Sequence, residues 1–293
     1  MKNMEFAVIG GDMRQVKLAE LLSKDGHNVS VFALDRAEPE GVNVRGSIKK
    51  AVEKSRCVVL PLPARSNDGA LNAPLSEGTY STEDVFSVLK PEQLVAAGRI
   101  DKGTYALAES YGLKLVDYYE REELVIANAV ATAEGAVQIA MEETPITLLN
   151  SRCLVIGHGR IGKILAHRLK GMGAEVTVSA RKYADMAWID AYGYKSLHTE
   201  RLRGHLGGFD IILNTAPVRV LDQKCLEEVD KDCLIIDLSS KPGGMDFVAA
   251  GNLGLEAVWA LSLPGEVAPV TSGKTIKNTI YNIIDEQGLT QTF

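Results

Sequence analysis

The chain has 293 residues, of which 46% are hydrophobic and 24% are charged. At roughly 100–200 residues per domain, this length predicts two domains with a sizeable core each. The composition excludes a disordered, collagen-like or disulfide-dense chain. Its 32 basic and 38 acidic residues give a net charge of -6, which argues against nucleic acid or an anionic membrane as a partner.

The cysteines and histidines have no metal-binding or redox spacing. No CxxC or HExxH pattern occurs, and three of the four cysteines lie in apolar runs. We therefore expect reduced core cysteines and no metal site.

The N-terminus runs directly into a strand-like segment without a basic region or a small-residue cleavage site. We therefore expect a cytoplasmic protein. The weakly polar stretch 124–141 contains Asn128, Thr132 and Glu134, so we interpret it as a buried helix rather than a membrane span.

In the first half of the chain, short apolar runs bounded by turn residues alternate with a helical pattern. The runs predict strands at 5–10, 28–34, 57–63, 94–98 and 114–118, with a helix at 14–24. This alternation is typical of βαβ units and a parallel sheet.

The second half repeats the pattern. It predicts strands at 153–157, 175–180, 210–214, 233–240 and 256–261. A linking helix covers 120–144 and stops before Pro145, and a last helix at 274–286 could cross back to the first domain. We predict an α/β fold of two doubly wound Rossmann-type domains, residues 1–128 plus 273–293 and residues 129–272.

A GxGxxG pattern lies between a predicted strand and an amphipathic helix, in LVIGHGRIGK. Gly157 permits the tight turn, Gly159 lets a pyrophosphate approach, and Gly162 allows close packing of helix and strand. Free amides at the helix start would hold the phosphates. The pattern predicts a dinucleotide site that also includes His158, Arg160 and Ile161; the alternative is a tight turn without a ligand.

The end of the next strand bears on the choice of dinucleotide. NAD enzymes place a carboxylate there for the ribose 2′-hydroxyl, but this chain has Ser179, Arg181 and Lys182. A hydroxyl and two cations favour the 2′-phosphate of NADP. The alternative is a solvated pair of cations.

In the first domain, the turn AVIGGDMRQ carries Asp12, which would repel a pyrophosphate. Arg14 at the following helix start could bind a small anion. Alternatively, Asp12 caps the helix and Arg14 lies on its exposed face.

Other polar loops follow strands of the second domain, where ligands collect in doubly wound folds. They include Leu263-Pro264-Gly265 and the expected cofactor contacts Asn214, Thr215, Ala216, Pro217, Leu238 and Ser239. Further upstream, Thr132 resembles a helix N-cap with Glu134 in its first turn. Ordinary turns and an ordinary capped helix would give the same patterns.

The whole chain resembles the family of dipicolinate synthase A subunits, sporulation enzymes of endospore-forming bacteria. The resemblance rests on six segments in order: AVIGGDMRQ, NAVATAEGAVQIA, VIGHGRIGK, LNTAPVRVL, DLSSKPGGMDF and LPGEVAPVTSGKTIKNTI. It implies a substrate domain joined to a Rossmann domain, with a C-terminal helix that returns to the first domain.

The resemblance also implies NADP-dependent oxidation of dihydrodipicolinate to dipicolinate, with a smaller flavoprotein-like B subunit as partner. A homo-oligomer is a separate expectation. For the dicarboxylate substrate our candidates are Arg14, Thr132 and Ser240. For catalysis they are Glu134, Asp12 and Lys241. The alternatives are a non-catalytic NADP-binding scaffold or sensor, and another NAD(P)-dependent 2-hydroxyacid or amino-acid dehydrogenase.

Overall fold

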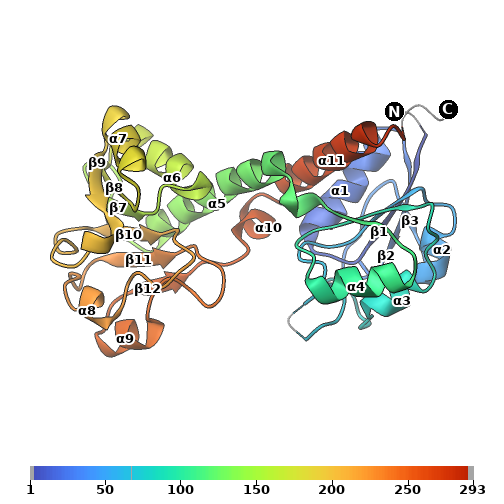
Figure 1. Cartoon of the computed structure of the whole chain (residues 1–293), viewed down its shortest axis with the longest axis horizontal. Helices are drawn as coiled ribbons and strands as arrows, with labels where there is room; N and C mark the ends of the chain where they lie inside the picture. Colours follow the sequence, from blue (N-terminus) through green and yellow to red (C-terminus); the bar gives the residue numbers. More distant parts are fainter. Residues whose placement is uncertain (1–2, 67, 290–293) are drawn as a thin grey trace. The chain divides into compact units, whose positions relative to one another are not determined.

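The computed structural model describes residues 3–66 and 68–289. The chain divides into two compact units, Met1–Asn128 with Ala268–Phe293, and Ala129–Val267. Each unit contains one parallel sheet of six strands flanked by helices (Figure 1). The predicted class, two Rossmann-type α/β domains, is confirmed.

The first unit has the strand order β3-β2-β1-β4-β5-β6. Its strands are β1 (Glu5–Ile9), β2 (Asn28–Phe32), β3 (Asn43–Val44), β4 (Cys57–Val59), β5 (Leu94–Ala97) and β6 (Leu115–Asp117). Its helices are α1 (Met13–Lys24), α2 (Ile48–Val52), α3 (Thr82–Phe86), α4 (Lys102–Ser110), the 3-10 turn η1 (Tyr118–Glu120) and α11 (Pro269–Glu286).

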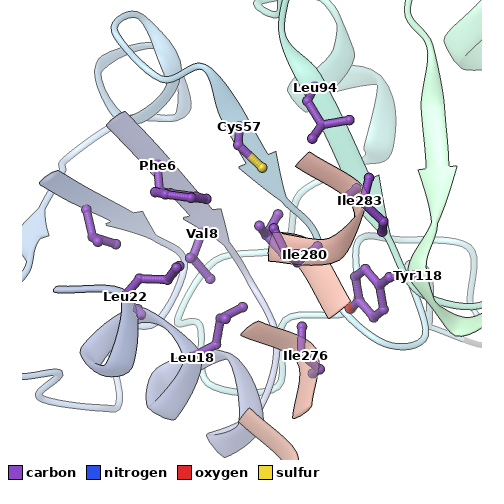
Figure 2. Packing of buried hydrophobic residues seen from close by; sticks show 14 of the residues in the cluster. Phe6, Val8, Leu18, Leu22, Cys57, Leu94, Tyr118, Ile276, Ile280 and Ile283 are labelled. Atoms are coloured by element: carbon purple, nitrogen blue, oxygen red, sulfur yellow. The ribbon is translucent and has the colours of Figure 1, made fainter. Parts of the chain in front are cut away.

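The C-terminal helix α11 belongs to the core of this first unit. Its Ile276, Ile280 and Ile283 pack among side chains from α1 and the sheet, including Leu18 and Phe6 (Figure 2). A Cβ added at Gly273 would lie 2.8 Å from the carbonyl oxygen of Arg14 on α1, so glycine permits the close helix approach. The predicted return of the last helix to the first domain is confirmed.

The second unit has the strand order β12-β11-β10-β7-β8-β9, which matches the first unit when it is read from β9. Its strands are β7 (Arg152–Ile156), β8 (Glu175–Ala180), β9 (Lys195–His198), β10 (Ile211–Asn214), β11 (Leu234–Asp237) and β12 (Ala257–Trp259). Its helices are α6 (Arg160–Gly171), α7 (Tyr183–Ala191), η2 (Thr199–Arg201), α8 (Gln223–Leu226), α9 (Phe247–Asn252) and α10 (Leu263–Val267).

Helix α5 (Glu122–Glu142) connects the two units. By length and composition alone it could cross a membrane, with 39% of its most apolar window buried. Its Ala133, Ala136 and Ala140 are fully buried in the core of the second unit. This packing agrees with the interpretation of the stretch as a core helix.

The sequence patterns missed the edge strands β3 and β9 and the short helix α10, and they misplaced the start of α11. Neither edge strand is a buried apolar run, which is the signal that identified the other strands. The predicted loop Leu263-Pro264-Gly265 is the start of α10, and α11 begins at Pro269 rather than Lys274. Proline suits the first turn of a helix because its missing amide would have no partner there.

Candidate functional site

The glycine-rich turn after β7 combines close packing with open space. Gly157 has a φ of +103°, and a Cβ on it would lie 2.6 Å from Oγ1 of Thr215. A Cβ on Gly162 would lie 2.0 Å from the carbonyl oxygen of Gly157. At Gly159, in contrast, an added Cβ would meet no atom within 4 Å. The first and third glycines therefore let α6 pack on the strand, and the second leaves room for a ligand.

Helix α6 begins at this open space without a side-chain cap. Gly159 is its N-cap residue and provides no capping side chain. The first amides of a helix have no partners within it, and its dipole favours an anion there. The turn therefore fits the pyrophosphate of a dinucleotide, held by the amides around Arg160 and Ile161.

Buried polar side chains hold the neighbouring loops in place. Asn214 donates through Nδ2 to Oδ1 of Asp237 at 2.9 Å, and Thr215 donates through Oγ1 to the Ile156 carbonyl at 2.9 Å. Asp237 also accepts from the amides of Ser239 at 3.0 Å and Gly244 at 2.7 Å. Asn214 and Thr215 thus use these groups to shape the turn that carries Ala216 and Pro217.

Asp237 is a site-shaping residue that the sequence analysis missed. It is fully buried at the end of β11 and fixes both ends of the loop that carries Ser240 and Lys241, two exposed residues. Its signal in the sequence was a single carboxylate closing the apolar run CLIID. A carboxylate in that position is buried only when amides bind it.

Two buried polar atoms just after β7 and β11 have no hydrogen-bond partner among the described residues: Nδ1 of His158 and Oγ of Ser239. His158 Nδ1 lies 3.9 Å from Oδ1 of Asp185, and burial lowers the pKa of His158. The backbone of Ser239 is fully used, since its amide binds Asp237 and its carbonyl accepts from Trp259 at 2.9 Å. Buried atoms without partners are rare, so they mark positions where ligand groups would fit.

The three residues expected to contact the ribose 2′-phosphate lie in two different environments. Arg181 and Lys182 are exposed directly after β8, and neither side chain makes a hydrogen bond or ion pair with any part of the chain that the structure describes. Ser179 is fully buried, and its hydroxyl accepts from Thr199 at 3.2 Å. Its predicted contact with a 2′-phosphate is therefore corrected: Ser179 supports the turn from behind, with its carbonyl accepting from Gly157 at 3.0 Å.

The turn after β1 in the first unit is closed by its own side chains. Asp12 caps α1 by accepting from the Arg14 amide at 2.9 Å, and Gln15 accepts in turn from the Asp12 amide at 3.2 Å. The Arg14 side chain is only 8% exposed, pairs with Asp12 at 2.8 Å and donates to the Leu62 carbonyl. The capping alternative is confirmed for Asp12, but Arg14 is buried rather than on an exposed face.

The expected helix start at Thr132 is wrong. Helix α5 begins at Glu122, so Thr132 and Glu134 lie in its interior, where the amides bond within the helix. Glu134 is exposed and forms an ion pair with Arg168 at 3.3 Å. Arg168 lies eight residues after the start of α6, about 12 Å along its axis from the glycine-rich turn. Glu134 therefore lacks the position at a helix start that suggested its catalytic role.

Comparison with known proteins identifies the family. A family model described as the N-terminal domain of the dipicolinate synthase A subunit matches residues 5–119, and one described as putative NAD(P)-binding matches residues 145–250. The dipicolinate synthase A subunit of Bacillus subtilis (strain 168) is 30% identical over 299 residues, which cover 98% of this chain and 97% of that protein. The chain belongs to the family of dipicolinate synthase A subunits.

Solved structures agree with this family assignment. The dipicolinate synthase A chain from Bacillus subtilis matches with a TM-score of 0.86 at 30% identity, over 98% of this chain and 97% of that one. The A subunit from Bacillus halodurans matches with a TM-score of 0.87 at 28% identity, over 97% and 99%. A transhydrogenase from Sinorhizobium meliloti, at 15% identity and a TM-score of 0.73 over 96% and 94%, shares the fold.

The matched NAD(P)-binding region covers the glycine-rich turn after β7, the loops after β10 and β11, and the residues Arg181 and Lys182 after β8. The chain therefore has a dehydrogenase-like architecture with a site for a nicotinamide dinucleotide. This confirms the predicted class of cofactor.

Proposed function

We propose that this chain is the NADP-dependent dehydrogenase subunit of a dipicolinate synthase, which oxidises dihydrodipicolinate to dipicolinate during sporulation. The observation that carries the proposal is the open, uncapped start of α6 at Gly159, in a chain of this family. Because its relatives are named as A subunits, we propose a B subunit as its partner. We also propose the cytoplasm as its location.

The preference for NADP over NAD rests on the corner after β8. The side chains of Arg181 and Lys182 are exposed and have no hydrogen-bond or ion-pair partner in the described chain, and no carboxylate ends the strand. The first acid of α7, Asp185, lies beside His158 instead. A guanidinium contact with a 2′-phosphate is a charge-assisted bond, worth on the order of 1.5–3 kcal/mol.

The overall reaction converts dihydrodipicolinate and NADP⁺ into dipicolinate, NADPH and a proton. When bound, NADP⁺ supplies the two-electron acceptor. Because the product ring is aromatic, the main tasks of the chain are to bind the carboxylates, orient the ring and accept a proton.

Asp12, Glu134 and Lys241 stay our candidates for the proton-transfer step. Asp12 and Glu134 already bind Arg14 and Arg168, respectively, whereas Lys241 lies exposed on the loop that Asp237 holds. For the substrate, the candidates from the sequence are Arg14, Thr132 and Ser240, of which Arg14 is already paired with Asp12. Thr132 would act through its side chain, because its amide is inside α5.

Titration of NADP and NAD with the wild type and Arg181→Ala tests the cofactor preference. We expect NADP to bind more tightly than NAD, and Arg181→Ala to weaken NADP binding about ten- to hundredfold while NAD binding changes less than twofold. Lys224→Ala, which removes an exposed cation on α8, is the matched control. Equal dissociation constants for the two cofactors would contradict the preference.

Turnover tests the reaction itself. Enzymatically generated dihydrodipicolinate and NADP are incubated with the purified chain, with and without its B partner, and NADPH formation is followed. Tight NADP binding without turnover in either mixture would favour the alternative of a non-catalytic, cofactor-binding scaffold.

A further inference from the structure

At the carboxyl edge of the first unit's sheet, backbone hydrogen bonds join the loops that follow the strands. The Gly11 amide donates to the Asn72 carbonyl at 2.9 Å, and the Asn72 amide donates to the Ala64 carbonyl at 3.1 Å. The Ala64 amide in turn donates to the Gly98 carbonyl at 2.8 Å. The segments that follow β1, β4 and β5 are thereby joined at one edge, where doubly wound sheets bind ligands.

Arg99 stands at this edge in an unusual backbone conformation. Its φ is +54°, in the left-handed region that few residues other than glycine adopt. Asp117 imposes this turn by accepting from the amides of Arg99 at 2.9 Å, Ile100 at 2.7 Å and Tyr119 at 2.7 Å. Arg99 is exposed, and its side chain makes no hydrogen bond or ion pair within residues 3–66 and 68–289. The fold thus presents an uncompensated guanidinium at the end of β5.

Arg65 and Arg99 lie next to each other on neighbouring loops, because the residues that precede them, Ala64 and Gly98, are joined by a backbone hydrogen bond. Its Nε donates to the Gly69 carbonyl at 2.7 Å, which fixes the side chain. Its only charged partner among the described residues is Asp101 at 4.0 Å, with both side chains partly exposed. Such an exposed pair is weak and leaves the guanidinium available.

Arg14, the sequence-based candidate at this edge, is differently placed. Asp12 engages both Nε and Nη2 of Arg14, and the pair is largely shielded from water. A substrate carboxylate at Arg14 would compete with this internal carboxylate. Of the arginines Arg14, Arg65 and Arg99, which follow β1, β4 and β5, only Arg65 and Arg99 therefore have an accessible charge.

The same edge is better suited to carboxylates than to phosphates. The helices that start here, α1 and α4, are capped by Asp12 and Asp101, so their first amides are partly occupied. Phosphate sites commonly use such amides. Two guanidinium groups beside helix starts that are already partly occupied would bind an anion mainly through their own paired hydrogen bonds, a geometry that suits planar carboxylates.

We propose that Arg99 and Arg65 bind the two carboxylates of the substrate, a six-membered nitrogen ring carrying carboxylates on either side of the nitrogen. The assignment rests on the proposed function for the identity of the dicarboxylate. Arg99 supplies the unpaired charge, Arg65 the second, and Asp117 positions Arg99 through the backbone.

The test uses the full chain with NADP and, as probes, pyridine-2,6-dicarboxylate and pyridine-2-carboxylate, with binding measured by calorimetry. We expect the wild type to bind the dicarboxylate more tightly than the monocarboxylate. Arg99→Ala and Arg65→Ala should each weaken dicarboxylate binding at least tenfold and reduce this difference. Arg99→Lys should recover part of the affinity, since it keeps the charge but loses the fork of donors.

Controls separate binding from folding. Lys114→Ala removes an exposed cation just before β6, at the opposite edge of the sheet, and should leave dicarboxylate binding unchanged. In all variants the NADP dissociation constant should stay within twofold and the melting temperature should stay close to that of the wild type.

The outcomes distinguish this inference from the proposed function. If the wild type oxidises dihydrodipicolinate but both arginine variants keep its KM and dicarboxylate affinity, the inference is wrong and the function stands. If the wild type binds the dicarboxylate through these arginines but shows no turnover, the function is wrong and the site stands. A wild type that does not bind the dicarboxylate contradicts the inference directly.

Discussion

After β1 the chain turns through Gly10 and Gly11 into a capped helix, whereas after β7 it turns through Gly157 and Gly159 into an uncapped one. The two sheets have equivalent strand orders, and both turns follow a central strand. The difference therefore comes from a few side chains and not from topology. Asp12 fills the first helix start, and Gly159 leaves the second open.

This comparison shows how one fold serves two purposes in a single chain. A carboxylate inside the first turn repels a pyrophosphate and at the same time holds a buried arginine. The second turn lacks any side chain at that place and keeps its helix amides for a ligand. Dinucleotide binding thus depends on the absence of a side chain at the start of the helix.

Among the variants that test this comparison, we expect the largest effect, a loss of stability, for Asp12→Ala. The substitution removes a helix cap and leaves the buried Arg14 charge without its partner. Cap loss costs about 1 kcal/mol, and a stranded buried charge about 3–5 kcal/mol. We expect the free energy of unfolding to fall by several kcal/mol, measured by urea denaturation, while the NADP dissociation constant stays within twofold.

A second variant isolates the charge from the cap. Asp12→Ala combined with Arg14→Leu should recover part of the lost stability, because no unpaired charge stays buried. A loss below about 1 kcal/mol for Asp12→Ala alone would contradict the interpretation of the first turn as closed by this pair.

The open turn is tested by Gly159→Ala, with a smaller effect. The backbone of Gly159, with φ −82°, accommodates alanine, and the added Cβ meets no atom. The methyl group would instead occupy the approach of the pyrophosphate. We expect binding of both NADP and NAD to weaken at least tenfold, about 1.4 kcal/mol, with an unchanged melting temperature.

Gly171→Ala, at the last residue of the same helix, is the matched control, since its Cβ is equally unobstructed. It should leave both dissociation constants unchanged. Equal affinities for the cofactor in Gly159→Ala and wild type would show that the ligand does not pass over the helix start.

The architecture could be predicted from the sequence because the central strands are short β-branched runs, such as CLVIG and EVTVSA, between turn residues. These positions are buried on both faces of the sheet, so their local pattern and their tertiary environment agree. The edge strands β3 and β9 are partly solvated and carry polar residues, so their sequences lack that pattern.

The site was less predictable, because its details depend on contacts between distant segments. Thr132 followed by an acid resembles a cap, but the alanine-rich stretch on both sides favours one uninterrupted helix. Ser179 is hydrogen-bonded to Thr199, which follows the neighbouring strand β9, and the left-handed turn at Arg99 is held by Asp117. No local motif encodes these pairings.

The smallest expected effect concerns acid sensitivity, and it compares two histidines with buried side chains, His27 and His158. His27 Nδ1 accepts from the Met4 amide at 3.2 Å, so in the neutral ring Nε2 carries the proton and donates to Tyr281 at 2.9 Å. Tyr281 donates to Asp25, which also binds Lys277. Protonation of His27 would break the bond to Met4.

Burial lowers the pKa of both His27 and His158 below the ordinary value of 6.5. For His27, Asp25 opposes this shift and Lys277 adds to it; for His158, Asp185 opposes it and Lys163 adds to it. As the pH falls below about 6.5, the unfolded chain binds protons before the folded chain does. The free energy of unfolding should therefore decrease in this range, by at most about 1.4 kcal/mol per pH unit for each histidine, and should be unaffected by these groups at higher pH.

Urea denaturation at about pH 7.5 and about pH 5.5 measures this loss of stability in acid. His27→Gln and His158→Gln should each reduce the difference between the two pH values, because each removes a group that the folded chain keeps neutral. His205→Gln, at an exposed position, should not reduce it. If His158→Gln leaves the difference unchanged while His27→Gln reduces it, the His158 imidazole reaches water in solution. Of these two histidines, only His27 in the first unit is then kept neutral by burial.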